Sequence, residues 1–415
     1  MRSSFNRRPA VRILLLSLFV PLIGLAQSNP KPERPPKPRQ QQKAGAKQKA
    51  GRGVEQDTLA EAGAISTSKL ALPFKRTWQH LTGGATPISP TLDDARIYLP
   101  LTGGRVSCLD RQTGSLLWSS EPGGLITAPV AAGENSVYIA TRNTSEDGAE
   151  AGGSLRAVDK ATGLTVWVRD YPRALSSALQ LGPDHIYAGS ADGAFYALDL
   201  KNGAVVWKVE TQDVVRGRAL VTTRAVYFGS DDGALRVVEP DRGQLLWKYQ
   251  TGGRIIGQPA ADDRVLYFGS ADGYVYSLDL ATGKLHWRAR TGAAIEASPV
   301  IVGDRLLVAS YDNFVYALAC SSGDRIWKRR LENRIAASPI VEGDASLVAP
   351  LHGDYIAVFS NADGRRVNLY QLDPDFEIVA EPIFSRDTLV LPTNQGLVVA
   401  TATKPVEPQT NAIRK

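Results

Sequence analysis

Residues 267–287, Tyr-Phe-Gly-Ser-Ala-Asp-Gly-Tyr-Val-Tyr-Ser-Leu-Asp-Leu-Ala-Thr-Gly-Lys-Leu-His-Trp, contain the pattern that decides the fold of this chain. Three apolar runs alternate with period two, and each of the two gaps between them carries an Asp and a Gly. This pattern predicts two successive β-hairpins. Gly273 and Gly283 fit the two turns because glycine adopts φ > 0 without steric cost, and Asp279 is expected to accept hydrogen bonds from its own turn.

The same unit recurs along the chain, and a Gly-x-x-x-Trp ending marks each copy. The tryptophans at these endings are Trp118, Trp167, Trp207, Trp247, Trp287 and Trp327. From Trp167 onward they are 40 residues apart, a period typical of β-propeller blades. A seventh copy has Asn368 in place of Trp, and Trp78 stands 40 residues before Trp118 without a preceding hairpin.

The repeat predicts an all-β fold, an eight-bladed β-propeller of four-stranded antiparallel blades, over residues 74–402. Eight inner strands are expected directly after Pro90, Pro129, Ala178, Ala219, Pro259, Pro299, Pro339 and Pro382. The last blade has only three strands of its own, ending at residues 396–401. We expect Phe74–Trp78 to supply its fourth strand, because this pairing closes the ring and removes two exposed sheet edges.

The N-terminal residues are predicted to be a targeting segment. Four arginines lie in residues 1–12, followed by the apolar run Ile13–Leu25 and the small-residue sequence Gly24-Leu25-Ala26. Residues 1–26 are therefore interpreted as a cleaved signal peptide for export to the periplasm, by the general secretory or the twin-arginine route. The run of thirteen residues contains Pro21 and falls short of the roughly 20 residues of a spanning helix, although an uncleaved anchor remains the alternative. No Cys follows the run, which argues against a lipoprotein.

Residues 27–73 are predicted to be a disordered linker, and residues 403–415 a flexible tail. The stretch 27–56 is rich in Pro, Lys and Gln and has a net charge of +6, whereas residues 57–415 have about −4. The basic stretch is interpreted either as a solvated spacer or as a contact for anionic lipid, nucleic acid or peptidoglycan. Blade 2 contains an insertion, Arg142–Gly153, that is interpreted as part of a binding face or as a neutral loop.

The repeat resembles that of the pyrroloquinoline-quinone (PQQ)-type propellers. The resemblance rests on Ala197-Leu198-Asp199, Gly203 and Trp207 and on their copies in the other blades. In that family the tryptophan packs between neighbouring blades. The resemblance therefore implies docking roles for Trp78, Trp118, Trp167, Trp207, Trp247, Trp287 and Trp327. The family contains quinoprotein dehydrogenases and non-catalytic outer-membrane assembly factors of the BamB type.

The residues favour a non-catalytic member. The dehydrogenases are usually far longer, stack PQQ on a channel Trp and often carry adjacent cysteines beside it, whereas every Trp here is expected at a docking position. Cys108 and Cys320 fall in blades 1 and 6, too far apart for a disulfide. The four histidines show no metal-ligand spacing, and the repeated serines of the Ser-x-Asp-Gly turns are explained by turn formation. We therefore predict no catalytic residue, no metal site and no cofactor, with PQQ and Ca²⁺ only in the alternative of a minimal quinoprotein.

Residues that precede the inner strands are expected to line the central channel. The charged candidates are Arg173, Arg218, Glu296, Arg334, Glu377 and Glu381. Three glutamates without an Asp make a poor Ca²⁺ site, while the arginines could hold an anion by charge-assisted hydrogen bonds. The other interpretation is a solvated funnel with balanced charge.

The resemblance to the BamB type implies a partner-binding face that carries the blade-to-blade connections. An apolar-Arg-Gly connection of that type corresponds to Val214, Val215 and Arg216, and the next connection offers Arg254, Ile255 and Ile256. Aliphatic side chains beside an arginine are typical of interface hot spots, although they are also typical of the start of a strand.

The sequence thus predicts a periplasmic scaffold of the BamB type that binds envelope proteins, possible partners being the components of the outer-membrane barrel-assembly machinery. We expect a monomer with no nucleic-acid partner and at most peripheral membrane association. The alternatives are a minimal PQQ-dependent dehydrogenase and an extracytoplasmic propeller that binds a ligand or polymer.

Overall fold

A computed structural model describes residues 66–145 and 148–403. The chain divides into two units, residues 1–61 and 62–415, and all described residues belong to the second. The predicted signal peptide, most of the predicted linker and nearly all of the predicted tail lie outside the described residues. In the part of the chain that is described, no helix is both long and apolar enough to cross a membrane.

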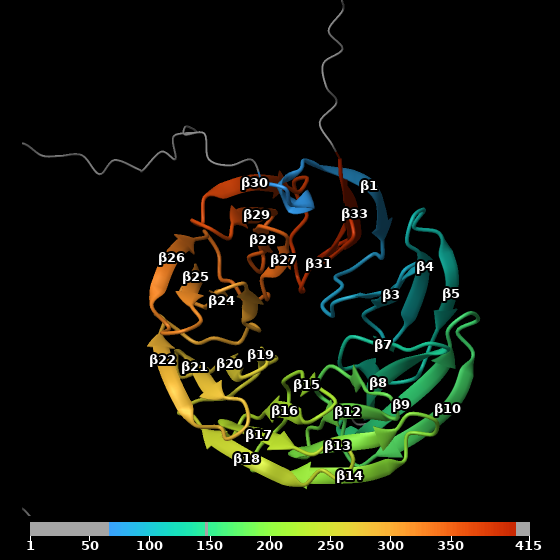
Figure 1. Cartoon of the computed structure of the whole chain (residues 1–415). Coiled ribbons are helices and arrows are strands. Elements are labelled where there is room, and N and C mark those ends of the chain that lie inside the picture. Colours follow the sequence, from blue (N-terminus) through green and yellow to red (C-terminus); the bar gives the residue numbers. More distant parts are fainter. Residues whose placement is uncertain (1–65, 146–147, 404–415) are drawn as a thin grey trace, which may run out of the picture. The chain divides into compact units, whose positions relative to one another are not determined.

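The described residues form eight antiparallel sheets arranged as blades around a central axis, as Figure 1 shows. Blade 1 consists of β2 (Thr91–Leu92), β3 (Arg96–Pro100), β4 (Val106–Asp110) and β5 (Leu116–Ser120). Blade 2 consists of β6 (Leu125–Ile126), β7 (Ala131–Ala132), β8 (Ser136–Thr144), β9 (Glu150–Asp159) and β10 (Thr165–Tyr171). Blade 3 consists of β11 (Gln180–Leu181), β12 (His185–Gly189), β13 (Ala194–Asp199) and β14 (Val205–Glu210). Blade 4 consists of β15 (Leu220–Val221), β16 (Val226–Gly229), β17 (Ala234–Val238) and β18 (Leu245–Gln250).

The second half of the ring repeats this four-stranded order. Blade 5 consists of β19 (Ala260–Ala261), β20 (Val265–Gly269), β21 (Tyr274–Asp279) and β22 (Leu285–Arg290). Blade 6 consists of β23 (Val300–Val302), β24 (Arg305–Ala309), β25 (Phe314–Ala319) and β26 (Arg325–Arg330). Blade 7 consists of β27 (Ile340–Glu342), β28 (Ala345–Val348), β29 (Tyr355–Ser360) and β30 (Arg366–Gln371). Blade 8 consists of β31 (Ile383–Ser385), β32 (Thr388–Thr393), β33 (Gly396–Ala402) and β1 (Phe74–Leu81).

The ring is closed by the N-terminal strand, which confirms the predicted fold. Strand β1 pairs antiparallel with β33, in a register that runs from Phe74 opposite Ala402 to Leu81 opposite Gly396. The eighth blade is thereby completed by residues more than 300 positions apart in the sequence. Its outer strand occupies the same place as the outer strands of the other seven blades.

The core of the ring lies between adjacent blades. The second and third strands of each blade are buried on both faces because each blade packs against two neighbours, whereas the outer strands alternate between exposed and covered positions. Phe195 of blade 3 and Phe228 of blade 4, for example, stack with ring centroids 4.0 Å apart. Stacks of this kind add to the apolar area that neighbouring blades bury.

Each tryptophan at the end of a repeat packs against a glycine of the next blade, so it lies between neighbouring blades as the family resemblance implies. Trp207 lies on Gly243, where a Cβ atom would come within 2.6 Å of the indole ring. Gly243 also has φ +66°, so both the contact and the backbone conformation exclude larger residues. The indole N–H of Trp207 donates to the carbonyl of Pro240, 2.8 Å away. The indole nitrogens of Trp78, Trp118, Trp287 and Trp327 donate in the same way to Arg111, Lys160, Cys320 and Asn361.

Asn368, which replaces the tryptophan of blade 7, faces a blade that has no turn between its third and fourth strands. The helix η1 (Lys69–Ala71) lies there instead. The Asn368 amide donates to the carbonyls of Leu70 and Leu72, at 3.0 and 2.7 Å. Asn368 therefore makes the hydrogen bond that an indole makes in the other blades.

The predicted linker extends to residue 73, but its last eight residues are packed on the propeller. Leu70 is fully buried in a cluster formed by blades 7 and 8. Ser66 and Ser68 donate hydrogen bonds to the carboxylates of Asp344 and Glu342. Residues 66–73 are therefore part of the propeller, because this segment replaces a turn that blade 8 lacks.

The insertion in blade 2 lengthens its central hairpin. Arg142 and Gly153 are paired in the extension of β8 and β9, and β6 pairs with the same stretch of β8. Because β6 lies in the connection between blades 1 and 2, the hairpin rises from the face of the ring that carries the blade-to-blade connections. This placement agrees with the prediction from the sequence.

Candidate functional site

The connection face is the side of the ring that carries the blade-to-blade connections and the Ser-x-Asp-Gly turns. Each turn contributes a fully buried or nearly fully buried serine, such as Ser230 and Ser270. The Ser270 hydroxyl donates to the carbonyl of Gly253 in the adjoining connection. The serine series is therefore structural, as expected from its repetition.

Two of the six predicted partner contacts are buried anchors of this face. Val215 and Ile255 are both 0% exposed. Each packs against a glycine at the end of a second strand: a Cβ on Gly189 would lie 2.5 Å from Val215 Cγ1, and one on Gly229 would lie 2.3 Å from Ile255 Cγ2. Val215 and Ile255 therefore hold the connection onto the preceding blade and expose no side-chain surface to a partner in this conformation.

The remaining four predicted contacts reach the surface. Arg216 and Arg254 are exposed, and Val214 and Ile256 are partly exposed. Alternation along each connection explains the difference, because successive side chains point to opposite sides of an extended backbone. The structure thus places two arginines and two aliphatic side chains on the connection face of blades 4 and 5.

The two arginines take part in a network of charges around the mouth of the channel. The Nε atom of Arg216 lies 2.6 Å from Oδ2 of Asp231, in the turn of the same blade. Arg254 of blade 5 donates through Nε to Oε1 of Glu296 in blade 6, at 2.9 Å. The Tyr311 hydroxyl donates to the other oxygen of Glu296, at 2.6 Å. The Arg254–Glu296 pair therefore links blades 5 and 6, while the Arg216–Asp231 pair lies within blade 4.

The network raises the pKa values of Tyr311 and Arg254, the two residues that share Glu296. Burial, followed by the hydrogen bond to Glu296 and the charge of that carboxylate, raises the pKa of Tyr311 to about 12. The hydrogen bond and charge of Glu296 likewise raise the pKa of Arg254. Both groups therefore keep their protons throughout the physiological range, and the network does not titrate there through them.

Asp231 and Tyr311 are the members of this network that sequence analysis missed. Both follow the serine of the turn, which reads Ser-x-Asp-Gly in blades 3 to 5 and Ser-x-Asp-Asn in blade 6, at the position where blades 3 and 5 have Ala191 and Ala271. An acidic and an aromatic residue stand where blades 3 and 5 have alanine. This difference was the signal in the sequence that could have identified them. The sequence offers no sign of their partners, which lie on separate connections.

The predicted channel residues divide into paired and unpaired groups. Glu381 accepts hydrogen bonds from the backbone N–H and the hydroxyl of Ser338. Glu377 lies 3.7 Å from His352. The exposed guanidinium groups of Arg218 and Arg334 have no hydrogen-bond or ion-pair partner among residues 66–145 and 148–403. Of the three predicted channel arginines, Arg218 and Arg334 are therefore available to a ligand without breaking a contact within the described residues.

Arg173 is one residue out of register with the other channel candidates. Gln180 pairs with Tyr187 as Leu220 pairs with Tyr227, so Leu179, and not Ala178, corresponds to Ala219. Arg173 Nη1 instead lies 3.3 Å from Oε2 of Glu150, next to the loop at the tip of the blade 2 hairpin. The sequence placed the start of this inner strand one residue too early.

The carboxylates near the channel do not form a calcium site in this structure. Within the described ranges, no group of three or more His, Cys, Asp or Glu side chains is arranged to hold a metal ion. Glu296 and Glu381 are already bound to protein donors, and five of the seven indole N–H groups donate to the docking carbonyls named above. A Ca²⁺ ion at these carboxylates would have to displace the donors that Glu296 and Glu381 already have.

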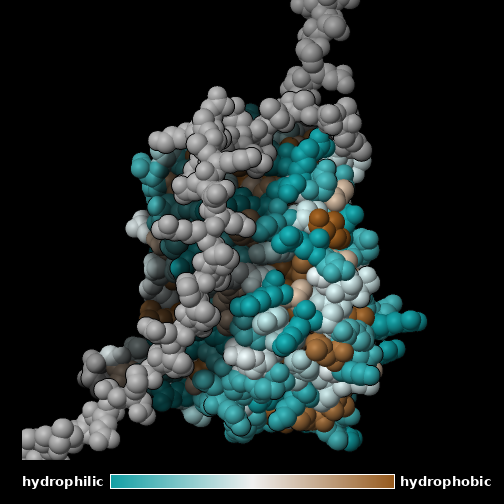
Figure 2. Space-filling view, turned by 90° about the vertical axis from the view of Figure 1, so that its left-hand side faces the viewer, coloured by the Kyte–Doolittle hydropathy of each residue, from teal (hydrophilic) through white to brown (hydrophobic). Residues whose placement is uncertain are grey.

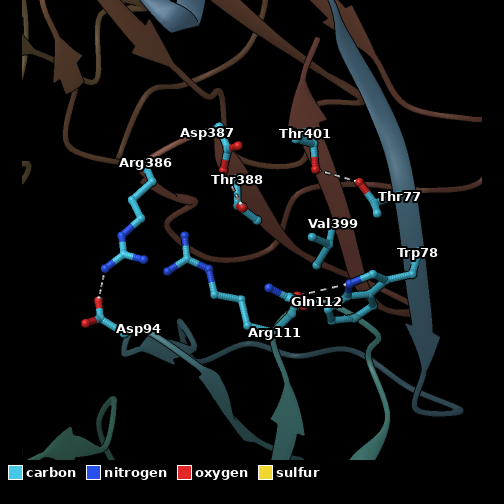
Figure 3. Close-up of a pocket in the computed structure, with 10 residues that line it drawn as sticks. All are labelled: Thr77, Trp78, Asp94, Arg111, Gln112, Arg386, Asp387, Thr388, Val399 and Thr401. Carbon is cyan, nitrogen blue, oxygen red and sulfur yellow. Dashed lines mark hydrogen bonds and ion pairs between the residues drawn. The ribbon is translucent and has the colours of Figure 1, made fainter.

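A cavity of about 300 Å³ lies on the opposite side of the ring, where blades 8 and 1 meet (Figure 3). Arg386 of blade 8 pairs with Asp94 of blade 1, with Nη2 and Oδ1 2.6 Å apart. Arg111 donates to the backbone carbonyls of Asp93 and Ser385. Because these charged groups already join the two blades, the cavity belongs to the ring closure.

Comparisons with known proteins agree on the architecture. Among solved structures, BamB from Moraxella catarrhalis is similar, with a TM-score of 0.68 at 19% identity over 79% of this chain and 99% of that chain. The quinohemoprotein alcohol dehydrogenase from Comamonas testosteroni has a TM-score of 0.65 at 12% identity over 84% of this chain and 80% of that chain. The computationally designed Ika8 protein has a TM-score of 0.66 at 18% identity over 79% and 98%. At these low identities, the TM-scores show that the proteins share a fold.

A comparison with curated protein sequences finds no relative. The family model described as "Outer membrane protein assembly factor BamB" matches residues 63–225, 151–313 and 231–412. These three overlapping matches extend over the whole propeller, from the segment before β1 to the residues after β33. The chain therefore belongs to the BamB family of PQQ-type β-propellers.

Proposed function

We propose that this protein is a non-catalytic scaffold that binds envelope proteins through the connection face of blades 4 to 6. The observation that carries the proposal is the family match over residues 63–412. Membership of a family described by its role in outer-membrane protein assembly favours the barrel-assembly machinery as the partner. The periplasm is the compartment in which such a partner would be met.

The chemistry of the connection face supports this proposal. Val214 and Ile256 offer partly exposed aliphatic surface beside the exposed guanidinium groups of Arg216 and Arg254. Arginine and aliphatic side chains at the centre of an interface commonly supply most of its binding energy. The ion pairs to Asp231 and Glu296 hold both guanidinium groups in place before a partner arrives. Pre-organised groups of this kind lose less entropy on binding.

The proposal is tested by affinity capture from the native envelope after mild cross-linking. The variant to compare is Arg216→Glu with Arg254→Glu, which leaves the buried anchors Val215 and Ile255 untouched. The matched control is Arg242→Glu, an exposed arginine in a turn on the opposite side of blade 4. Thermal unfolding of all three proteins verifies that the exchanges leave the fold intact.

We expect the wild type and the Arg242→Glu control to recover outer-membrane assembly components, and the double variant to recover at least tenfold less. If the double variant recovers these components at the wild-type level, the partner binds a surface that does not include Arg216 and Arg254. Absence of these components from the wild-type sample would contradict the assignment to outer-membrane assembly.

A further inference from the structure

The outer strands of blades 5 and 6 carry a concentration of positive charge that none of the functions above uses. Strands β22 and β26 contain six basic residues and no acidic residue. They are Arg288, Arg290, Arg325, Lys328, Arg329 and Arg330, all of them exposed. We call these six residues the basic rim. It lies on the circumference of the ring, at right angles to the connection face.

The charges of the basic rim are not neutralised by carboxylates. In the part of the chain that the structure describes, none of the six residues takes part in an ion pair. Aromatic rings contact some of them: Lys328 Nζ lies 4.4 Å from the ring centroid of Phe314, and Arg288 Cζ lies 4.8 Å from that of Tyr274. Aromatic faces position cations without cancelling their charge. The rim therefore presents a positive field to solvent.

The basic rim does not reflect the composition of the folded part, and its six cations exceed those of any other two adjacent outer strands, including Arg366 of β30 and Lys75 and Arg76 of β1. Residues 57–415 have a net charge of about −4. The outer strands of blades 1 to 4 carry three basic residues, Arg169, Lys208 and Lys248, against Asp170 and Glu210. Lys208 is paired with Glu210.

The circumference is therefore divided between an apolar and a basic part. Before their tryptophans, the outer strands of blades 1, 3 and 4 expose pairs of aliphatic residues: Leu116 and Leu117, Val205 and Val206, Leu245 and Leu246. Figure 2 views the ring from the side of blades 5 and 6 and shows hydrophilic side chains with separate hydrophobic spots between them. The exposed Leu285 and Ile326 lie on β22 and β26 themselves.

The distribution of the six cations suits an extended anionic surface better than a small ligand. They are spread along two neighbouring six-residue strands, each about 20 Å long, instead of converging on one point. Exposed Leu285 and Ile326 stand among them, and basic side chains around aliphatic ones are the composition of surfaces that bind anionic membranes. We propose that the basic rim is a contact surface for a membrane that displays anionic phosphate headgroups.

Such a contact leaves the connection face free. Because the rim is the edge of the disc and the connection face is one of its flat sides, a protein lying with blades 5 and 6 on a membrane still exposes Arg216 and Arg254 beside it. Membrane contact and partner binding therefore use different residues. The membrane proposal does not depend on the proposed function.

The test is co-sedimentation of the full chain with vesicles of phosphatidylcholine alone and of phosphatidylcholine mixed with phosphatidylglycerol. The rim variant is Arg288→Gln, Arg290→Gln, Lys328→Gln and Arg330→Gln, and a second variant replaces Arg288, Arg290 and Arg330 by Lys to keep the charge. The matched control is Lys208→Gln with Lys248→Gln, which occupy in blades 3 and 4 the position of Arg288 and Lys328. The basic stretch 27–56 is identical in all of these proteins and so cannot produce a difference between them.

We expect the wild type to bind the vesicles that contain phosphatidylglycerol and not those of phosphatidylcholine alone. This binding should weaken as the salt concentration is raised. Each charge removed should weaken binding about fivefold, so the four exchanges of the rim variant together cost on the order of 10²-fold or more. The lysine variant and the Lys208→Gln, Lys248→Gln control should bind within about threefold of the wild type. This set of results would support the rim as the contact.

Equal binding by the rim variant and the wild type would overturn the proposal. So would displacement of the wild type from vesicles by millimolar inorganic phosphate, which would indicate a site for free anions. Preferential binding to soluble polyglutamate over vesicles would overturn it in favour of an acidic protein partner. A third result would also overturn it: the rim variant aggregates, but its remaining monomer binds vesicles as the wild type does. The charges would then serve only to prevent aggregation through an exposed sheet edge.

Discussion

The residue four positions after the Asp of each turn shows which substitutions the repeat tolerates. Asp192, Asp272 and Asp312 each accept a hydrogen bond from a tyrosine hydroxyl four residues later. Blade 4 replaces this tyrosine by Arg236, which forms a nearly buried ion pair with Asp232 at 2.6 Å. The repeat thus keeps a donor at this position while changing its charge.

The buried pair predicts an acid-dependent loss of stability in blade 4. Burial alone would raise the pKa of Asp232, but hydrogen bonds from Arg236, Ser230 and two backbone N–H groups outweigh it and hold the pKa far below its usual range. A lowered folded-state pKa stabilises the fold above the unfolded value of about 3.9, and this stabilisation is lost as the pH falls toward the folded value. Urea unfolding between pH 3 and pH 7 should therefore show wild type and Asp232→Asn converging below about pH 4.

The control for this prediction is Arg236→Lys, which keeps the positive charge. It should retain the acid dependence of the wild type because the lysine still stabilises the ionised form of Asp232. A constant difference between Asp232→Asn and wild type at every pH would contradict the prediction.

At the scale of elements, the propeller is closed by two separate pieces of its N-terminal segment. Strand β1 supplies the outer strand of blade 8, and helix η1 replaces the turn that would have joined β33 to it. Asn368 is therefore the counterpart of a docking tryptophan in a blade interface where no glycine turn exists. The departure from the repeat marks the point where the chain enters and leaves the ring.

This arrangement predicts that η1 contributes directly to the stability of the ring. Leu70→Ala should lower the free energy of unfolding by about 2–5 kcal/mol, because Leu70 is fully buried between blades 7 and 8. The neighbouring Lys69 is exposed, so Lys69→Ala should change it by less than about 0.5 kcal/mol. Chemical denaturation measures both, and equal values for the two variants would show that η1 is not docked in solution.

The molecule as a whole presents surfaces of different chemistry. The connection face combines ion pairs with partly exposed aliphatic side chains, the rim of blades 5 and 6 is basic, and the outer strands of blades 1, 3 and 4 expose aliphatic pairs. A ring of similar blades can carry such differences because the outer and surface positions of each blade contribute little to packing. The function of the molecule is therefore expected to depend on positions outside the repeat.

The same organisation predicts that the protein does not take up PQQ. The residues nearest the channel offer no converging carboxylates, since Glu296 and Glu381 are held by Tyr311 and Ser338. Titration of the full chain with PQQ and Ca²⁺ should leave both the absorbance of PQQ and the melting temperature of the protein unchanged. A shifted PQQ absorbance with a raised melting temperature would instead support the dehydrogenase alternative.

The sequence alone determined the blade number, the strand order and the closing strand. These features follow from a 40-residue period and from short-range patterns, and both recur in each copy of the repeat along the chain. The turn at Gly243 could be predicted for the same reason, while the docking role of Trp207 came from the resemblance to the PQQ-type propellers.

Only the tertiary structure decided which residues of the site reach the surface and which meet. Val214 and Val215 are equally apolar, yet only packing against Gly189 shows that Val215 is the buried one. The contacts of Arg254 with Glu296, and of Asn368 with Leu70, join residues about 40 and 300 positions apart. Such contacts depend on how the ring brings distant segments together, and the local pattern of the sequence carries no information about them.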